Sequence, residues 1–198
     1  QLAEKVAYVP QVHRRTFPYM VKDIVLMGRA HRTNIFTSPD KEDMRIADEA
    51  MEKVGISHLA DEPYTQISGG QCQLVMVARA LAQQPDIIIM DEPTSHLDFK
   101  NELMVLETVV DLIKQNNISV IMATHFPNHA YYFETNNVST TLALMNNEKF
   151  EKIGSPQQIL SEENIRKIYG VDSKVLNYSI DKTTLIRQIV PLSIVKNA

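Results

Sequence analysis

The strongest constraint on this chain comes from two short, mainly apolar runs. Residues 86–93 read DIIIMDEP and residues 118–125 read ISVIMATH. Neither run alternates regularly between apolar and polar residues, which is typical of strands buried on both faces of a parallel sheet. A helix is expected between them, from about Lys100 to Gln115, and its apolar side chains at helical spacing are Leu103, Leu106, Val110 and Ile113. Strand, helix and strand in this order predict a βαβ crossover, and hence an α/β fold with a parallel-sheet core.

Composition narrows the class of protein. The chain has 198 residues, a net charge of −4 and a pI near 5.9. We therefore expect one domain with its own core and no nucleic acid as partner, because phosphate backbones attract clustered Lys and Arg. The single cysteine, Cys72, fits a reducing cytoplasm. No apolar run approaches the roughly 20 residues that a membrane helix needs.

Further elements are expected before the first apolar run. A weak β pattern covers Lys5–Val9, and a short helix ends near Gly28. A longer helix begins after Ser38 as N-cap and stops at Gly55. Its apolar face comprises Ile46, Ala47, Ala50 and Val54. Another helix opens at Ser68, ends before Pro85, and presents Leu74, Val77, Ala78, Leu81 and Ala82 on one face.

The last third of the chain has a different pattern. A hairpin is expected with its turn at Asn146-Asn147, followed by a pair of short helices up to Gly170. The remaining residues are β-like.

Three groups of residues carry the chemistry. Asp91 and Glu92 end a buried strand, where α/β proteins bind ligands, so one carboxylate can hold Mg²⁺ and the next can polarise a water. The alternative is a strand end capped by solvated acids. His125 and Gln11 follow other strands at the same edge, and each can instead be an ordinary loop residue. A metal pair of His125 with His129 is disfavoured, because Pro127 intervenes and no third ligand is near in sequence.

The third group is Ser68-Gly69-Gly70-Gln71, at the start of a helix. Glycines let a phosphate approach the backbone N–H groups, and the helix dipole favours negative charge. The alternative is an ordinary serine N-cap.

In order and spacing, Gln11, SGGQ, DEPTSHLD at 91–98 and His125 resemble the nucleotide-binding domain of ATP-binding cassette (ABC) transporters. The resemblance runs from YVPQ near the start to IVPL near the end. It implies ATP and Mg²⁺ as cofactors, with Asp91 and Gln11 on the magnesium side. It also implies that Glu92 is the general base and that His125 bonds the γ-phosphate.

The remaining motifs follow from the same resemblance. Residues 68–71 correspond to the signature motif, which serves a nucleotide held by a second subunit, and Asp98 ends the D-loop. Residues of about 12–84 correspond to the helical subdomain that docks on membrane partners. The resemblance thus implies a nucleotide-binding domain over 1–170 and leaves 171–198 as a C-terminal extension, expected to be β.

Longer stretches of sequence, including DIVLMGRAHRTNIF and THFPNHA, resemble those of the ATP-binding subunits of metal-chelate importers. This group comprises the iron–siderophore, haem and cobalamin systems and the related molybdate or tungstate systems. This implies an ATPase subunit at the cytoplasmic face of the membrane. Its partners would be a second copy, integral permease subunits and, indirectly, a substrate-binding protein.

The chain departs from the family in three respects. It contains no GxxxxGK[ST] sequence, the lysine loop (Walker A) of P-loop NTPases. The aromatic residue that stacks on adenine is also missing, and Cys72 replaces a residue that is usually basic. We therefore expect a partial P-loop NTPase fold that lacks its N-terminal strands and lysine loop, is truncated just before the Q-loop to which Gln11 corresponds, and is inactive alone. Simple removal of a starting methionine is the alternative explanation for the first residue. Two other functions stay open: a non-catalytic subunit that lends its signature motif, and a soluble ABC ATPase.

Overall fold

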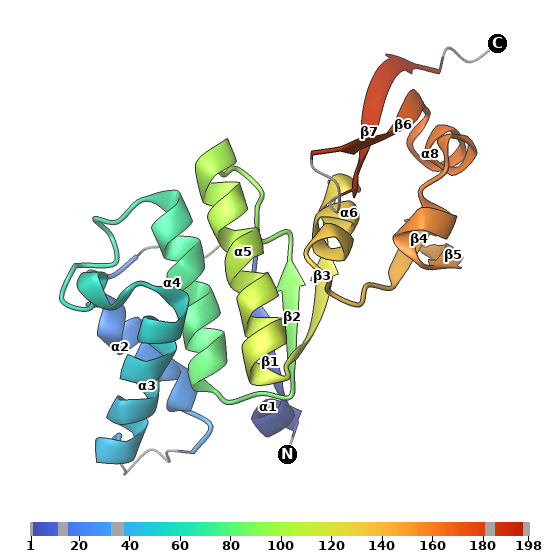
Figure 1. The fold of residues 1–198 in the computed structure, drawn as a ribbon. Helices are drawn as coiled ribbons and strands as arrows, with labels where there is room; N and C mark the ends of the chain where they lie inside the picture. The colour runs from blue at the N-terminus through green and yellow to red at the C-terminus, as the bar shows by residue number, and fades with distance from the viewer. Residues whose placement is uncertain (1, 12–15, 33–37, 181–184, 196–198) are drawn as a thin grey trace. The chain divides into compact units, whose positions relative to one another are not determined.

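The computed structural model describes residues 2–11, 16–32, 38–180 and 185–195 (Figure 1). It divides the chain into two compact units, Gln1–His125 and Phe126–Ala198, which are described separately. The predicted boundary between residues 170 and 171 separates the nucleotide-binding domain from a C-terminal extension, and it stays a prediction. Residues 12–15 and 33–37 of the predicted helical subdomain lie outside the described residues.

The first unit contains a parallel sheet of three strands in the order β1-β2-β3. The strands are β1 (Val6–Val9), β2 (Ile87–Asp91) and β3 (Ser119–Ala123), and a short helix, α1 (Leu2–Lys5), precedes them. Helix α5 (Phe99–Asn116) joins β2 to β3, so the predicted strand, helix and strand are present in a parallel arrangement. This confirms the α/β class and the parallel-sheet core.

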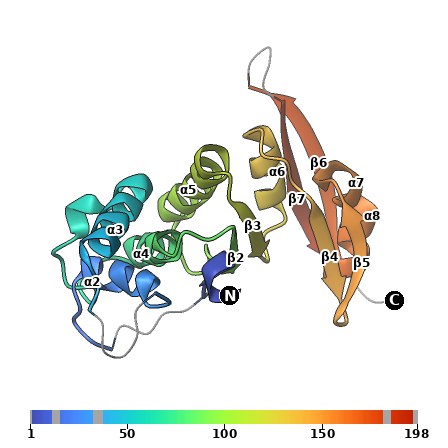
Figure 2. The same ribbon diagram turned by 90° about the horizontal axis from the view of Figure 1, so that it is seen from below.

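The two faces of this sheet differ in burial. On one face Ala7, Val9, Ile88 and Met90 are buried, beneath α4 (Gly69–Ala82) and α5 (Figure 2). On the other face Tyr8 is paired with Ile89 and Ile89 with Ile121, and two of these side chains are exposed, Tyr8 by 51% and Ile121 by 58%. The prediction that the strands are buried on both faces is therefore wrong, because the described helices cover one face.

Helices α2 (Val21–Leu26), α3 (Lys41–Val54) and α4 pack against one another, joined by the 3₁₀ turns η1 (Met27–Arg29) and η2 (Ser57–Leu59). Gly55 ends α3 in the left-handed conformation, with φ +77°, as predicted. The N-cap of α3 is Asp40 and not Ser38, because Asp40 and Asp43 form a reciprocal capping box two residues further on.

The buried face of α5 is rotated from the predicted one. Leu106 and Val110 are buried as expected, but Leu103 is 37% exposed. The buried stripe also includes Val105, Val109 and Leu112. Two overlapping apolar series exist in this helix, and only the packing of its neighbours decides which one is covered.

The second unit packs two antiparallel hairpins against short helices. In chain order it contains α6 (Asn128–Thr135), β4 (Leu142–Asn146), β5 (Lys149–Gly154), α7 (Pro156–Ile159), α8 (Glu162–Tyr169), β6 (Val171–Ser179) and β7 (Leu185–Ile194). Its core includes Tyr131, Leu144, Leu160 and Ile189. The turn of the first hairpin is at Asn147-Glu148, one residue later than predicted, and both residues have positive φ.

Candidate functional site

Glu92 is the centre of a polar cluster at the carboxyl end of the parallel sheet. Its Oε2 accepts a hydrogen bond of 2.7 Å from Nε2 of Gln11, and its Oε1 lies 2.6 Å from Nε2 of His125. The three side chains follow β1, β2 and β3 respectively, and the in-register parallel pairing of these strands brings them together. The residues proposed from sequence at this edge therefore do meet in the structure.

The backbone of Glu92 is unusual. Its φ is +43°, in the left-handed region that residues other than glycine rarely adopt. Its N–H donates to the carbonyl of Ala123 on the neighbouring strand at 2.9 Å, and its own carbonyl accepts from Ser95 at 3.1 Å. These bonds hold the chain in a sharp turn directly after Asp91, which presents the carboxylate of Glu92 to Gln11 and His125. Backbone strain of this kind is enriched at functional sites.

Asp91 faces the more open side of the sheet. Its Oδ2 accepts a hydrogen bond from the hydroxyl of Tyr8 at 3.2 Å. Partial desolvation, and then the Asp91 carboxylate, raise the pKa of the Tyr8 hydroxyl. Sequence reasoning missed Tyr8, although parallel register would have found it: Tyr8 pairs with Ile89, and Asp91 lies two residues further on the same face.

The donor set at this edge suits Mg²⁺. Asp91 and Glu92 offer carboxylate oxygens and Gln11 an amide oxygen, which are the hard ligands that Mg²⁺ prefers. Within the described part of the chain, no group of three or more His, Cys, Asp and Glu side chains gathers as a metal cage. Mg²⁺ is normally held by one or two carboxylates together with substrate phosphates.

The SGGQ sequence forms the first turn of α4. Ser68 is the N-cap: its hydroxyl accepts from the N–H of Gln71 at 3.2 Å, and Oε1 of Gln71 accepts from the N–H of Ser68 at 2.9 Å. The glycines between them lie against the start of α5. A Cβ on Gly70 would lie 2.2 Å from Oδ1 of Asn101, whereas a Cβ on Gly69 would have Leu97 as its nearest neighbour, at 3.9 Å.

Asp98 is the N-cap of α5, and its carboxylate holds the Asn101 side chain beside Gly70. Its Oδ1 accepts from the N–H of Asn101 and its Oδ2 from Nδ2 of Asn101, both at 2.8 Å. Asn101, which sequence reasoning did not single out, therefore links Asp98 to the space beside Gly70. Among the described residues, no hydrogen bond or ion pair connects this second group to the Glu92 cluster.

We expect Gly70→Ala to lower the free energy of unfolding by about 1–3 kcal/mol, because the new methyl group must displace Asn101. Gly69→Ala is the matched control in the same helical turn. Its new methyl group makes only an ordinary van der Waals contact with Leu97, so it should be neutral or stabilising by up to about 1 kcal/mol. Urea unfolding followed by circular dichroism measures both. Equal stability of the two variants would contradict the close contact at Gly70.

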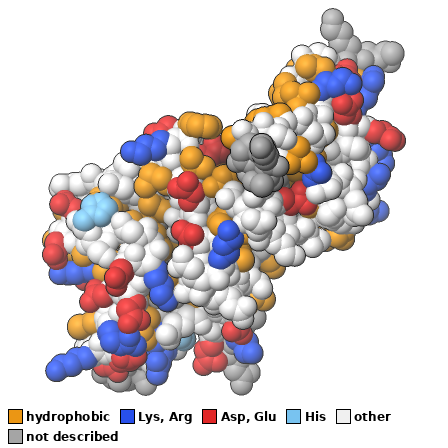
Figure 3. All heavy atoms as spheres, viewed as in Figure 1, with side chains coloured by type: hydrophobic (Ala, Val, Ile, Leu, Met, Phe, Trp, Pro, Cys, Tyr) orange, Lys and Arg blue, Asp and Glu red, His pale blue; other side chains and the backbone are white. Residues whose placement is uncertain are grey.

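Other sequence candidates are placed away from these groups. Cys72 is buried, with its Sγ 3.9 Å from the carbonyl oxygens of Tyr64 and Ile67. His129 is buried in α6, in the second unit. On the face shown in Figure 3, acidic and basic side chains are interspersed over the helices of the first unit. No described helix has the length and apolar character required to cross a membrane.

Known proteins have sequences similar to that of this chain. A model of a family described as ABC transporter matches residues 1–95. The chain is 40% identical to an uncharacterised ABC transporter ATP-binding protein of Haemophilus influenzae, over 91% of this chain and 66% of the relative. It is 36% identical to the molybdate import ATP-binding protein MolC of the same organism, over 85% of this chain and 64% of the relative.

A solved structure decides the assignment. It is described as a metal-chelate type ABC transporter in an inward-facing conformation, and it matches 96% of this chain and 73% of its own with a TM-score of 0.87 and 34% identity. The chain belongs to the ABC transporter ATP-binding proteins. The family match covers Gln11, the SGGQ turn and the Glu92 turn. This ABC chain spans about two-thirds of the length of the two Haemophilus influenzae relatives, 66% and 64%.

Proposed function

We propose that this chain is part of the ATP-hydrolysing subunit of an ABC importer that takes up a metal chelate or a related metal oxyanion. The observation that carries the ATPase role is the carboxylate of Glu92, held between Gln11 and His125 at the edge of the sheet. The import role is supported by the similarity to MolC and to the metal-chelate type transporter. Iron–siderophore, haem, cobalamin, molybdate and tungstate all remain candidates for the cargo.

In this proposal Glu92 is the general base for the attacking water. Gln11 and His125 hold the carboxylate in place before nucleotide arrives, and they exchange this contact for the water and the γ-phosphate when it does. Asp91 would hold Mg²⁺ through its water shell, and the bound ion would neutralise charge on the phosphates. Tyr8, through its hydrogen bond, fixes the orientation of the Asp91 carboxylate.

The SGGQ turn would serve a nucleotide bound mainly by a second cassette. The first N–H groups of α4 and the hydroxyl of Ser68 would bind the γ-phosphate of that nucleotide, and Gly69 leaves room for its approach. Gln71 keeps the turn in shape through the capping box. Asp98, beside the SGGQ turn through Asn101, would lie at the same interface.

The partners follow from this proposal. They are a second nucleotide-binding subunit, integral permease subunits on the cytoplasmic face of the membrane, and a substrate-binding protein reached through the permease. The test is affinity purification of the native protein from detergent-solubilised membranes. An integral membrane protein should be recovered in constant ratio with it, and recovery from the soluble fraction alone would favour a soluble ABC ATPase instead.

We expect the 198-residue chain to bind MgATP weakly and to hydrolyse none. The sequence holds no lysine loop to contact the β- and γ-phosphates, and those contacts supply much of the binding energy in P-loop proteins. Isothermal titration calorimetry with MgATP measures the affinity, with an ABC cassette that carries a lysine loop as positive control. A micromolar dissociation constant for this chain would refute the expectation.

A non-catalytic subunit that only lends its SGGQ turn is the second candidate. The assembled cluster of Gln11, Glu92 and His125 argues against it, because a subunit without turnover has no use for a positioned base. The DNA upstream distinguishes the two: an in-frame GxxxxGK[ST] sequence supports the catalytic subunit.

A further inference from the structure

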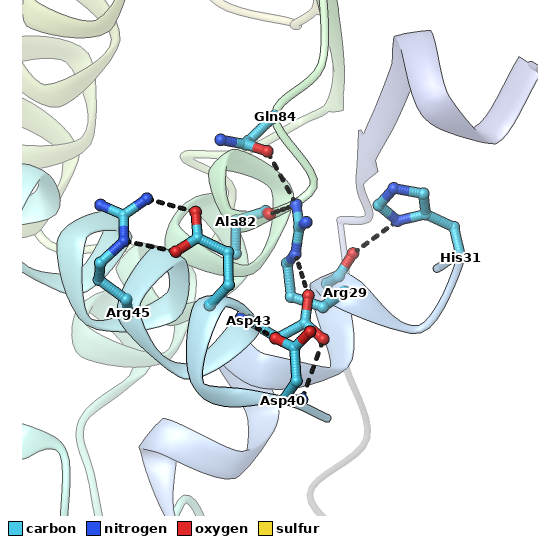
Figure 4. A network of polar contacts seen from close by, with 9 residues as sticks. Arg29, His31, Asp40, Asp43, Arg45, Ala82 and Gln84 are labelled. Carbon is cyan, nitrogen blue, oxygen red and sulfur yellow. Dashed lines mark hydrogen bonds and ion pairs between the residues drawn. The ribbon is translucent and has the colours of Figure 1, made fainter. Parts of the chain in front are cut away.

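Arg29 is buried at the centre of a polar network in the helical part of the first unit (Figure 4). Its Nε donates to Oδ1 of Asp43 at 3.0 Å. Its Nη1 donates to the carbonyl of Ala82 at 2.9 Å and to Oε1 of Gln84 at 3.1 Å. The exposed fraction of Arg29 is 1% and that of Asp43 is 6%. We call these four residues the Arg29 network.

The network joins two helix ends of opposite polarity. Asp43 lies in the first turn of α3, where it also accepts from the N–H of Asp40 at 3.2 Å. Ala82 is the last residue of α4, so its carbonyl has no partner within the helix. The guanidinium therefore supplies a donor and a positive charge at the negative end of the SGGQ helix, and its partner carboxylate lies at the positive end of α3.

Gly28 brings the backbone of η1 close to α4. A Cβ on Gly28 would lie 2.2 Å from the carbonyl oxygen of Arg79, which is too short for any side chain. This close approach places Arg29 next to the last turn of α4. Gly28 and Arg29 thus attach one short segment to the SGGQ helix in two ways, by backbone contact and by side-chain hydrogen bonds.

The network is not arranged for stability alone. Nη2 of Arg29 is buried and has no hydrogen-bond partner in the part of the chain that the structure describes. Burying a charged pair also has a desolvation penalty that apolar side chains of similar volume avoid. The forked guanidinium instead fixes the relative orientation of its partners, because it binds the Asp43 carboxylate, the carbonyl at the end of α4 and the Gln84 amide at the same time.

We propose that Arg29 is a positioning residue that locks the carboxyl end of the SGGQ helix to the start of α3, so that α2, α3 and the SGGQ turn move as one rigid body. The consequence for transport rests on the proposed function. If a membrane partner moved α2 and α3, Ser68 and Gly70 would move with them. The Arg29 network would prevent α3 from sliding against α4.

Distance measurement between spin labels on α3 and beside the SGGQ turn tests this directly. Labels are attached to cysteines introduced at the exposed positions Asp48 and Gln66, in a Cys72→Ala background. The parent protein should give one narrow distance distribution by double electron–electron resonance. Arg29→Met/Asp43→Leu removes the charges while keeping apolar volume, and its distribution should broaden or split.

Arg29→Lys covers the case in which the double variant does not fold. It keeps a cation beside Asp43 but lacks the fork that reaches Ala82 and Gln84, so its distribution should broaden as well. Arg45→Met, on the exposed face of α3, is the matched control and should leave the distribution narrow. A narrow, unshifted distribution in the folded Arg29 variants would overturn the proposal. Because no nucleotide or membrane partner is present, that outcome leaves the proposed transport function untouched.

Discussion

Glu92→Gln, in a cassette where a GxxxxGK[ST] segment precedes these residues, is expected to abolish turnover while leaving ATP binding intact. Glutamine has nearly the same shape as glutamate and can still pair with Gln11 and His125, but it cannot accept the proton of an attacking water. Loss of a general base typically reduces a rate by about 10²–10⁴-fold. Steady-state ATPase assays give the rate, and equilibrium binding of MgATP gives the affinity.

The matched control for this experiment is Glu107→Gln on the exposed surface of α5. It makes the same chemical change away from the sheet edge and should keep the full rate. Unchanged turnover in Glu92→Gln would exclude Glu92 as the base. Loss of binding together with turnover would instead mean that the carboxylate has a structural role.

Arg29→Met alone is expected to lower the free energy of unfolding by about 3–5 kcal/mol, because it leaves the carboxylate of Asp43 buried without its counter-ion. Arg45→Met on α3, the helix that carries Asp43, is the control. Arg45 pairs with Glu42 and Glu49 at the surface, so its loss should have a much smaller effect on the free energy of unfolding. Urea unfolding at neutral pH measures both variants, and similar values would contradict the importance of burial.

The pH dependence gives a second check on the same variant. The hydrogen bond from Arg29 holds the pKa of Asp43 below its usual value, despite burial. A lowered folded-state pKa contributes stability that is present above the unfolded pKa of about 3.9 and is lost as the pH falls through the folded value. Without Arg29, burial favours the protonated acid, so the stability gap between parent and variant should narrow toward pH 4.

The meeting of three polar residues at one sheet edge was predictable from the sequence, although only the resemblance to ABC nucleotide-binding domains favoured them over ordinary loop residues. Polar residues after three strand-like runs gave Gln11, Glu92 and His125, because the carboxyl ends of parallel strands meet at one edge. The βαβ order and the cap at Ser68 followed equally from local patterns. These features depend on short-range rules that the tertiary structure does not override.

The features that were predicted wrongly or not predicted at all share a different cause. Sequence placed the N-cap of α3 at Ser38, but Asp40 forms the capping box with Asp43. The buried stripe of α5 and the open face of the sheet depend on which neighbours are present. Arg29 was invisible for the same reason, since its partners lie up to 55 residues away in sequence. Nothing in a single sequence indicates that a charged side chain will be enclosed by segments so far apart.

Asn101 has a consequence for how the motifs are dissected by mutagenesis. Its amide binds Asp98 on one side and borders Gly70 on the other, so a single side chain is shared by two motifs that are distant in sequence. Substitutions at Asp98 and Gly70 should therefore be non-additive, as is usual for positions with a common neighbour. Double-mutant cycles between the two positions are needed before an effect is attributed to either one.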